Sequence, residues 1–289
     1  MTRTSVAESL QSSVRALGAR FDPEVLAATR ALYRPHIPAG PGPALGGISY
    51  GPHERHRLDV YLPAGRPQGV LVYVHGGGFV GGDKDLDGVF YRNVGQALNR
   101  EGFAVVAANY RRAPECSWPS GARDVQGAVQ WVHANMHQFK AGTLPVFVMG
   151  QSAGASHVAS WLFDDAARAG ALPPTAGVLL MSGFYRARHP LTETIAAYFG
   201  TDPECYEQRS PLTHVKPVQA PLWLGVAEFD PGSIASHTFE LAQAIASRNG
   251  RSPSFQWLPG HNHVSTVLSI GSPHQDAGME ILRFLRAQL

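Results

Sequence analysis

The sequence predicts an α/β protein built on one mostly parallel sheet of about eight strands, with helices on both faces. From residue 69 onward, short and nearly continuous apolar runs alternate with longer helical segments. Runs that are apolar throughout are typical of strands buried on both faces, and strands that alternate with helices pair in parallel. With 44% hydrophobic and 16% charged residues, the chain of 289 residues can bury one large core. This length allows one large domain or two small ones, and we expect a single domain over residues 1–289.

The first 43 residues, 1–43, are expected to form a helical arm that precedes the main body. Amphipathic patterns predict two helices in this arm, and a connector rich in proline and glycine, residues 38–43, marks its boundary. Two strand-like segments follow, and the polar residues between them suit a hairpin. The helices are expected over 6–17 and 23–33, and the strands over 47–50 and 57–62.

In the main body, strands and helices are expected to alternate. The expected strands cover residues 70–75, 104–109, 146–149, 178–181, 222–227 and 255–258. The expected helices cover residues 88–99, 122–136, 152–168, 233–248 and 275–289. Residues 183–217 interrupt the alternation, with one expected helix over 192–199, and this stretch is far longer than a usual connection. Long insertions at this edge of a sheet commonly form lids or pocket walls, so we expect residues 183–217 to be a cap.

Charge and composition exclude several classes of partner. The formal net charge of +2 arises from 24 basic and 22 acidic residues spread along the chain, without a basic run that would favour nucleic acid. No apolar run approaches the roughly 20 residues of a membrane span, and the N-terminal residues lack the apolar core of a signal peptide. The two cysteines, Cys116 and Cys205, are expected to be free thiols in a reducing compartment. A cytoplasmic protein is therefore expected.

Ser152 is the leading candidate for a catalytic nucleophile. It lies in the sequence Gly-Gln-Ser-Ala-Gly, residues 150–154, between a short apolar strand and a helical segment. Such a strand-to-helix turn holds a serine in a strained conformation with its hydroxyl exposed, and the flanking glycines avoid steric collisions. The N-terminus of the following helix favours a developing negative charge. A small-residue turn without catalytic function is the alternative.

A glycine-rich loop, residues 75–79, follows the expected strand 70–75 and is the candidate oxyanion hole. Consecutive glycines allow backbone N–H groups to turn toward a ligand without a side-chain clash. We expect the N–H groups of Gly77 and Gly78 to act together with that of Ala153, the residue after the nucleophile. A phosphate-binding loop is the alternative, but the Lys-Ser/Thr or Gly-x-Gly-x-x-Gly patterns of such loops are missing.

Asp230 is the candidate acid, because it follows the expected strand 222–227 and precedes a proline. Glu228 is the second choice, and a helix cap for the segment starting near Ser233 is the structural alternative for Asp230. His263 is the candidate base, since it follows the last expected strand and completes the chain order Ser, Asp, His. His261 is expected to shape the same loop. The pair also resembles two metal ligands, but nearby residues do not complete a ligand set, so no metal is expected.

Together, the motifs resemble those of hormone-sensitive-lipase-like esterases of the α/β-hydrolase superfamily. These motifs are His-Gly-Gly-Gly-Phe at 75–79, Gly-Gln-Ser-Ala-Gly at 150–154, Asn-Tyr-Arg-Arg-Ala-Pro-Glu at 109–115, and Trp118-Pro119 with Asp124 and Trp131. The segment 56–63 is also similar to kynurenine-formamidase-like and feruloyl-esterase-like relatives, although Phe79 stands where these proteins usually carry tryptophan. The resemblance runs from about Arg57 to the C-terminus. It implies an α/β-hydrolase fold, the triad Ser152, Asp230 and His263, and the oxyanion hole Gly77, Gly78 and Ala153.

The leading functional hypothesis is hydrolysis of carboxylic esters with small to medium acyl groups through an acyl-enzyme, without a cofactor. Amide cleavage of the arylformamidase type uses the same groups and remains open. A non-catalytic receptor for a small ligand is the hypothesis from another class. The expected partner is a small ester substrate, and a homodimer is left open. Candidate pocket residues are the aromatics Phe184, Tyr185, Tyr198 and Phe199, with ordinary core packing as their alternative role.

Overall fold

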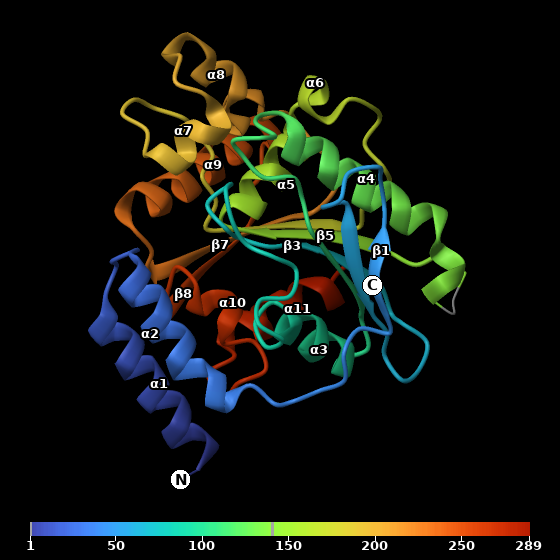
Figure 1. The fold of residues 1–289 in the computed structure, drawn as a ribbon, viewed down its shortest axis with the longest axis vertical. Coiled ribbons are helices and arrows are strands. Elements are labelled where there is room, and N and C mark those ends of the chain that lie inside the picture. Colours follow the sequence, from blue (N-terminus) through green and yellow to red (C-terminus); the bar gives the residue numbers. More distant parts are fainter. Residues whose placement is uncertain (1, 140–141) are drawn as a thin grey trace.

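The computed structural model describes residues 2–139 and 142–289, which contain one sheet of eight strands (Figure 1). Its strand order is β1-β2-β4-β3-β5-β6-β7-β8. The strands are β1 Leu45–Ser49, β2 Arg57–Tyr61, β3 Val70–Val74, β4 Ala104–Ala108, β5 Val146–Gln151, β6 Gly177–Met181, β7 Leu222–Phe229 and β8 Ser254–Asn262. Only β2 pairs in the antiparallel sense, with β1 and with β4, and the other pairs are parallel. This arrangement confirms the predicted α/β-hydrolase fold.

The central strands are buried on both faces because each face carries its own apolar layer. Every residue of β3, β4, β5 and β6 is buried, as the continuous apolar runs predict. Along β3, Val70, Val72 and Val74 pack in one layer, whereas Leu71 and Tyr73 pack in the other. This alternation follows from the two-residue period of a strand.

Two groups of helices supply the rest of these layers (Figure 1). The helices α4 Ser120–Ala134, α5 Ala153–Phe163 and α9 Gly232–Asn249 cover one face. The opposite face is covered by α3 Arg92–Arg100, α10 Ser265–Leu268 and α11 Asp276–Arg286. In Figure 1 the two groups lie above and below the sheet.

Three predicted boundaries differ from the structure by four residues or more, each for a local reason. The helix expected over 152–168 breaks at Asp164, whose carboxylate accepts hydrogen bonds from the N–H groups of Ala166 and Ala167 and caps a separate helix, α6 Asp165–Arg168. The helix expected from residue 88 starts at Arg92, because Tyr91 just before it has a positive φ of 64°. Strand β8 reaches Asn262, beyond the expected end at residue 258, because it stays paired with the extended end of β7.

Residues 2–43, called here the N-terminal arm, contain α1 Arg3–Leu17 and α2 Pro23–Tyr33, which lie beside β8 (Figure 1). Residues 183–217, called here the cap, contain α7 Glu193–Phe199 and α8 Tyr206–Arg209 together with short 3-10 turns. Within the described residues, the structure has no helix that combines the length and apolar character needed to cross a membrane.

Candidate active site

Ser152 stands at the turn where β5 ends and α5 begins, with a φ of 55° and a ψ of −125°. A positive φ is strained for a residue with a side chain, so the surrounding backbone must hold it. The glycines on both sides leave the necessary room. A Cβ on Gly150 would lie 2.4 Å from the carbonyl oxygen of Gly154, and a Cβ on Gly154 would lie 2.2 Å from the carbonyl oxygen of Val74.

The structure brings together the three side chains singled out as nucleophile, base and acid. The Nε2 atom of His263 lies 2.8 Å from the Oγ atom of Ser152. On the other side of the ring, the Nδ1 atom of His263 lies 2.7 Å from an oxygen of Asp230. His263 and Asp230 are buried, whereas the side of the site at Ser152 is partly open. The three residues come from three different strand ends on one edge of the sheet.

The carboxylate of Asp230 is held by two further hydrogen bonds. Its second oxygen accepts one from the Ser182 hydroxyl at 2.7 Å and one from the N–H of Ala227 at 2.8 Å. Both contacts hold the carboxylate toward His263. The alternative role of Asp230 as a helix cap is wrong, because α9 begins at Gly232 without a side-chain cap.

Sequence reasoning missed Ser182 and the contribution of Gln151. Ser182 follows the last residue of β6 directly, and that position at a strand end was the available signal. The side-chain amide of Gln151 donates to the carbonyl oxygen of His263 at 3.0 Å, so the residue before Ser152 also anchors the candidate base.

The alternative candidates for acid and base, Glu228 and His261, make their contacts outside the Ser152–His263–Asp230 chain. Glu228 accepts a hydrogen bond from the Gly260 N–H at 2.7 Å and pairs with Arg15 of the N-terminal arm at 3.1 Å. His261 lies 3.0 Å from the hydroxyl of Ser265 and stacks on His274 with ring centroids 4.1 Å apart. Burial holds the pKa of His261 well below its usual value.

The glycine-rich loop, residues 75–82 and called here the oxyanion loop, lies directly against the turn at Ser152. A Cβ on Gly76 would lie 3.2 Å from the Cβ of Ser152. Gly77 and Gly78 have φ values of 153° and 58°, which glycine adopts without strain. In the described part of the chain, the N–H groups of Gly77, Gly78 and Ala153 have no protein acceptor. They are therefore available to a bound oxygen.

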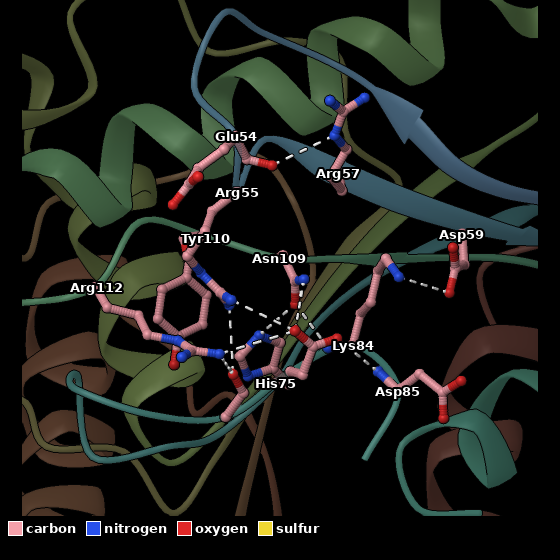
Figure 2. Close-up of polar contacts among 12 residues, drawn as sticks. Glu54, Arg55, Arg57, Asp59, His75, Lys84, Asp85, Asn109, Tyr110 and Arg112 are labelled. Atoms are coloured by element: carbon pink, nitrogen blue, oxygen red, sulfur yellow. Dashed lines mark hydrogen bonds and ion pairs between the residues drawn. The ribbon is translucent and has the colours of Figure 1, made fainter. Parts of the chain in front are cut away.

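A buried polar network fixes the start of the oxyanion loop (Figure 2). The side-chain oxygen of Asn109 accepts a hydrogen bond from the Lys84 N–H at 2.7 Å and lies 3.0 Å from Nε2 of His75. The amide nitrogen of Asn109 donates to Asp83 at 2.9 Å, which sets the orientation of this amide. Burial lowers the pKa of His75 to about 4, so the ring is neutral near pH 7.

The far end of the loop is held by two arginines (Figure 2). Arg55 donates to the carbonyl oxygen of Gly82 at 3.3 Å and to that of Tyr110 at 2.8 Å. Arg112 donates to the same Gly82 oxygen. Both guanidinium groups also pair with Asp83. The loop is thus anchored at both ends before any ligand arrives.

The cap packs on the oxyanion loop through Phe79. The ring of Tyr198, from α7, stacks on that of Phe79 with centroids 4.8 Å apart, and the rings of Phe184 and Phe199 meet it edge to face. These rings form one apolar cluster with Ala153 beside the turn at Ser152. Tyr185 belongs to the central core. Of the four predicted pocket aromatics, three therefore pack in the cluster beside Ser152, and Tyr185 has its alternative role of core packing.

Comparisons with known proteins find esterases among the relatives of this chain. Residues 58–163 match the family model described as BD-FAE, a range that contains Ser152 and the oxyanion loop but ends before Asp230 and His263. The esterase LipQ of Mycobacterium tuberculosis is 26% identical over 80% of this chain and 60% of its own length. An acetylcholinesterase of Myxine glutinosa is 38% identical over 36% of this chain and 33% of its own length. The chain thus spans three fifths or less of these curated relatives.

Solved structures share the fold over nearly the whole chain. A structure described as an arylesterase superposes with a TM-score of 0.71 and 18% identity, and covers 98% of this chain and 98% of its own. A bacterial heroin esterase superposes with a TM-score of 0.70 and 21% identity, and covers 97% of both chains.

Proposed function

We propose that this chain, a member of the α/β-hydrolase superfamily with carboxylesterases among its relatives, is a serine hydrolase that cleaves carboxylic esters. One observation carries the proposal: Ser152, His263 and Asp230 form a continuous hydrogen-bonded chain with heavy-atom distances of 2.8 and 2.7 Å. A serine hydroxyl is a weak nucleophile near neutral pH, and such a chain activates it. The relatives named as esterases support the same reaction class.

In the first half of the reaction, Ser152 attacks the acyl carbonyl while Nε2 of His263 takes the hydroxyl proton. Asp230 holds the imidazole through Nδ1 and stabilises the positive charge that develops on the ring. The carbonyl oxygen becomes an oxyanion, and the N–H groups of Gly77, Gly78 and Ala153 are proposed to bind it. Anchoring of the oxyanion loop at both ends keeps these donors in place without reorganisation.

Collapse of the first tetrahedral intermediate breaks the ester bond to the alcohol oxygen, which takes the proton from the His263 imidazolium, and the acyl group remains on Ser152. Water then enters, His263 takes its proton, and the hydroxide attacks the acyl carbonyl. Collapse of this second tetrahedral intermediate breaks the bond to the Ser152 oxygen, which takes the proton back from His263, and the carboxylic acid is released. No cofactor takes part in these steps.

We propose small to medium acyl groups for the substrate, because aromatic rings crowd the space beside Ala153. Phe79, Phe184 and Phe199 pack against one another there with centroid distances between 5.4 and 6.4 Å. The cap supplies two of the three rings, so we propose residues 183–217 as the wall of the acyl pocket.

Replacement of the nucleophile is the direct test. Ser152→Ala should lower kcat for p-nitrophenyl acetate by about 10⁴-fold or more, with an unchanged melting temperature. Ser160→Ala, a buried serine two turns along α5, is the matched control and should retain activity. A fluorophosphonate should label wild-type protein and Ser160→Ala but not Ser152→Ala. Wild-type turnover by Ser152→Ala would reject the proposal.

The same experiment separates the two remaining hypotheses. Folded wild-type protein that neither hydrolyses esters nor reacts with the fluorophosphonate would favour a non-catalytic receptor. The triad chemistry is common to ester and amide bonds, so substrate preference has to distinguish them. Faster turnover of N-formylkynurenine than of p-nitrophenyl acetate would favour amide cleavage.

A further inference from the structure

Phe21 lies in the turn between α1 and α2, and its ring packs on the imidazole of His263. The two ring centroids are 4.6 Å apart and the planes meet at 75°, an edge-to-face contact. Nevertheless, 49% of Phe21 remains exposed. An aromatic ring that both touches the candidate base and faces solvent is placed where a substrate would meet it.

The turn that carries Phe21 has a defined conformation. Gly18 ends α1 with a φ of 67°, and the side chain of Asp22 caps α2 by accepting a hydrogen bond from the Val25 N–H at 2.9 Å. Only a few residues separate these two caps. The position of Phe21 is thus set by the two helices on either side.

The N-terminal arm is itself attached to the segments that carry the acid and the base. Arg15 pairs with Glu228, which in turn accepts from the Gly260 N–H three residues before His263. Further along the arm, the buried hydroxyl of Thr29 accepts from the side-chain amide of Asn262 at 2.9 Å. These contacts hold Phe21 on the imidazole from two sides.

The direction of proton transfer decides which part of a substrate lies beside Phe21. In the proposed reaction, on which this inference rests, His263 gives its proton to the oxygen of the leaving alcohol. That oxygen must therefore lie next to Nε2, and the remainder of the alcohol extends past the same imidazole ring. The acyl group lies on the other side, toward Ala153 and the aromatic cluster of the cap.

The charges in this turn favour a neutral alcohol. Arg20 is paired with Asp22 at 2.9 Å and with Glu24 at 3.4 Å. The turn thus places two carboxylates around one guanidinium, and its net negative charge disfavours an anionic leaving group. Beside it, the open face of Phe21 offers an apolar, flat surface.

We propose that Phe21 is a specificity-determining residue that binds the alcohol part of the substrate, and that the preferred substrates are esters of neutral aromatic alcohols. Stacking or edge-to-face contact with an aromatic ring stabilises such a complex beyond simple burial of area. A short aliphatic alcohol does not reach the ring of Phe21 and gains nothing from it.

Benzyl acetate and ethyl acetate test this inference, because both release an alkyl alcohol and share the acyl group. With Phe21→Ala, we expect kcat/KM for benzyl acetate to fall roughly three- to tenfold, mainly through a higher KM. For ethyl acetate the change should stay below about twofold. Phe21→Trp should restore the preference for benzyl acetate. Phe239→Ala, which removes an equally exposed phenylalanine from α9, is the matched control and should alter neither ester.

Each other outcome overturns a different statement. Equal losses for both esters would show that Phe21 positions His263 and does not select the alcohol. No loss for either ester would show that substrates do not contact it. A wild-type protein that hydrolyses neither ester and resists fluorophosphonate labelling would overturn the proposed function, and this inference with it.

Discussion

The two halves of the candidate site are held together in different ways. The nucleophile half, Ser152 and the oxyanion loop, depends at its centre on tight backbone packing, with positive φ at Ser152, Gly77 and Gly78, and uses side chains only to anchor the two ends of the loop. The acid–base half, Asp230 and His263, is held by side chains that include residues from the opposite end of the chain. Thr29 and Asn262, for example, are separated by 233 positions in the sequence.

This difference determines what each half tolerates. Backbone atoms in a tight turn cannot move aside for an added methyl group, so the nucleophile half should respond steeply to small changes. A network of separate side-chain contacts loses one member at a time, so the acid–base half should respond in graded steps.

The largest expected effect compares one glycine from each half. Gly154→Ala would place its Cβ 2.2 Å from a backbone oxygen, and we expect a loss of about 3 kcal/mol in unfolding free energy and nearly all ester turnover. In contrast, Gly232, two residues after Asp230, has open space around it. Gly232→Ala should change stability by less than about 1 kcal/mol, toward higher stability. Urea unfolding measures both, and similar losses would contradict the comparison.

The next effect concerns acid stability in the nucleophile half. Burial lowers the pKa of His157 to about 3, and neither ring nitrogen has a hydrogen-bond partner among the described residues. Well above pH 6.5 the ring is neutral in both the folded and the unfolded state. As the pH falls from 6.5 toward 3, His157 binds a proton in the unfolded chain but stays neutral in the folded protein. Stability from this group is therefore lost by about 1.4 kcal/mol per pH unit.

His157→Leu should remove this contribution. We expect the unfolding free energy of the variant to fall less steeply between pH 7.5 and pH 5 than that of wild type, by roughly 2 kcal/mol over the interval. Urea titrations at the two pH values measure the difference. Parallel pH dependences would show that His157 titrates alike in both states.

The smallest expected effect lies in the acid–base half. Glu228→Ala leaves the buried Gly260 N–H without its acceptor, so the end of β8 before His263 should loosen and kcat should fall roughly fivefold. Arg15→Ala removes only the half-exposed partner of Glu228, and should cost less than about 1 kcal/mol with little change in kcat. Identical kinetics for Glu228→Ala and wild type would contradict a role for this contact.

Much of the nucleophile half could be predicted from the sequence because its signals are local. The apolar run at 146–149, the glycines at 150 and 154 and the following helical segment stand within a few residues of each other. The helix break at Asp164 could also have been predicted, since an aspartate that ends one helix and caps the next has a local sequence signature.

The partners of the acid–base half could not be predicted in the same way. No residue near Phe21 in the sequence indicates that its ring contacts His263. For Ser182, the only sequence signal for its contact with Asp230 is its position directly after a strand. Asn109 belongs to a recognisable motif, but its hydrogen bonds to His75 and Lys84 depend on how the β3 and β4 ends meet.

The sequence by itself determined the order of strands and helices, the mostly parallel sheet, the nucleophile turn and the glycine loop. These follow from hydrophobic periodicity and from the steric needs of glycine, which act between neighbouring residues. Only the tertiary structure decided that Asp230 and not Glu228 faces His263, that three cap aromatics pack beside Ala153, and that Phe21 contacts the candidate base. Such contacts join residues that are tens to hundreds of positions apart, and no local pattern encodes them.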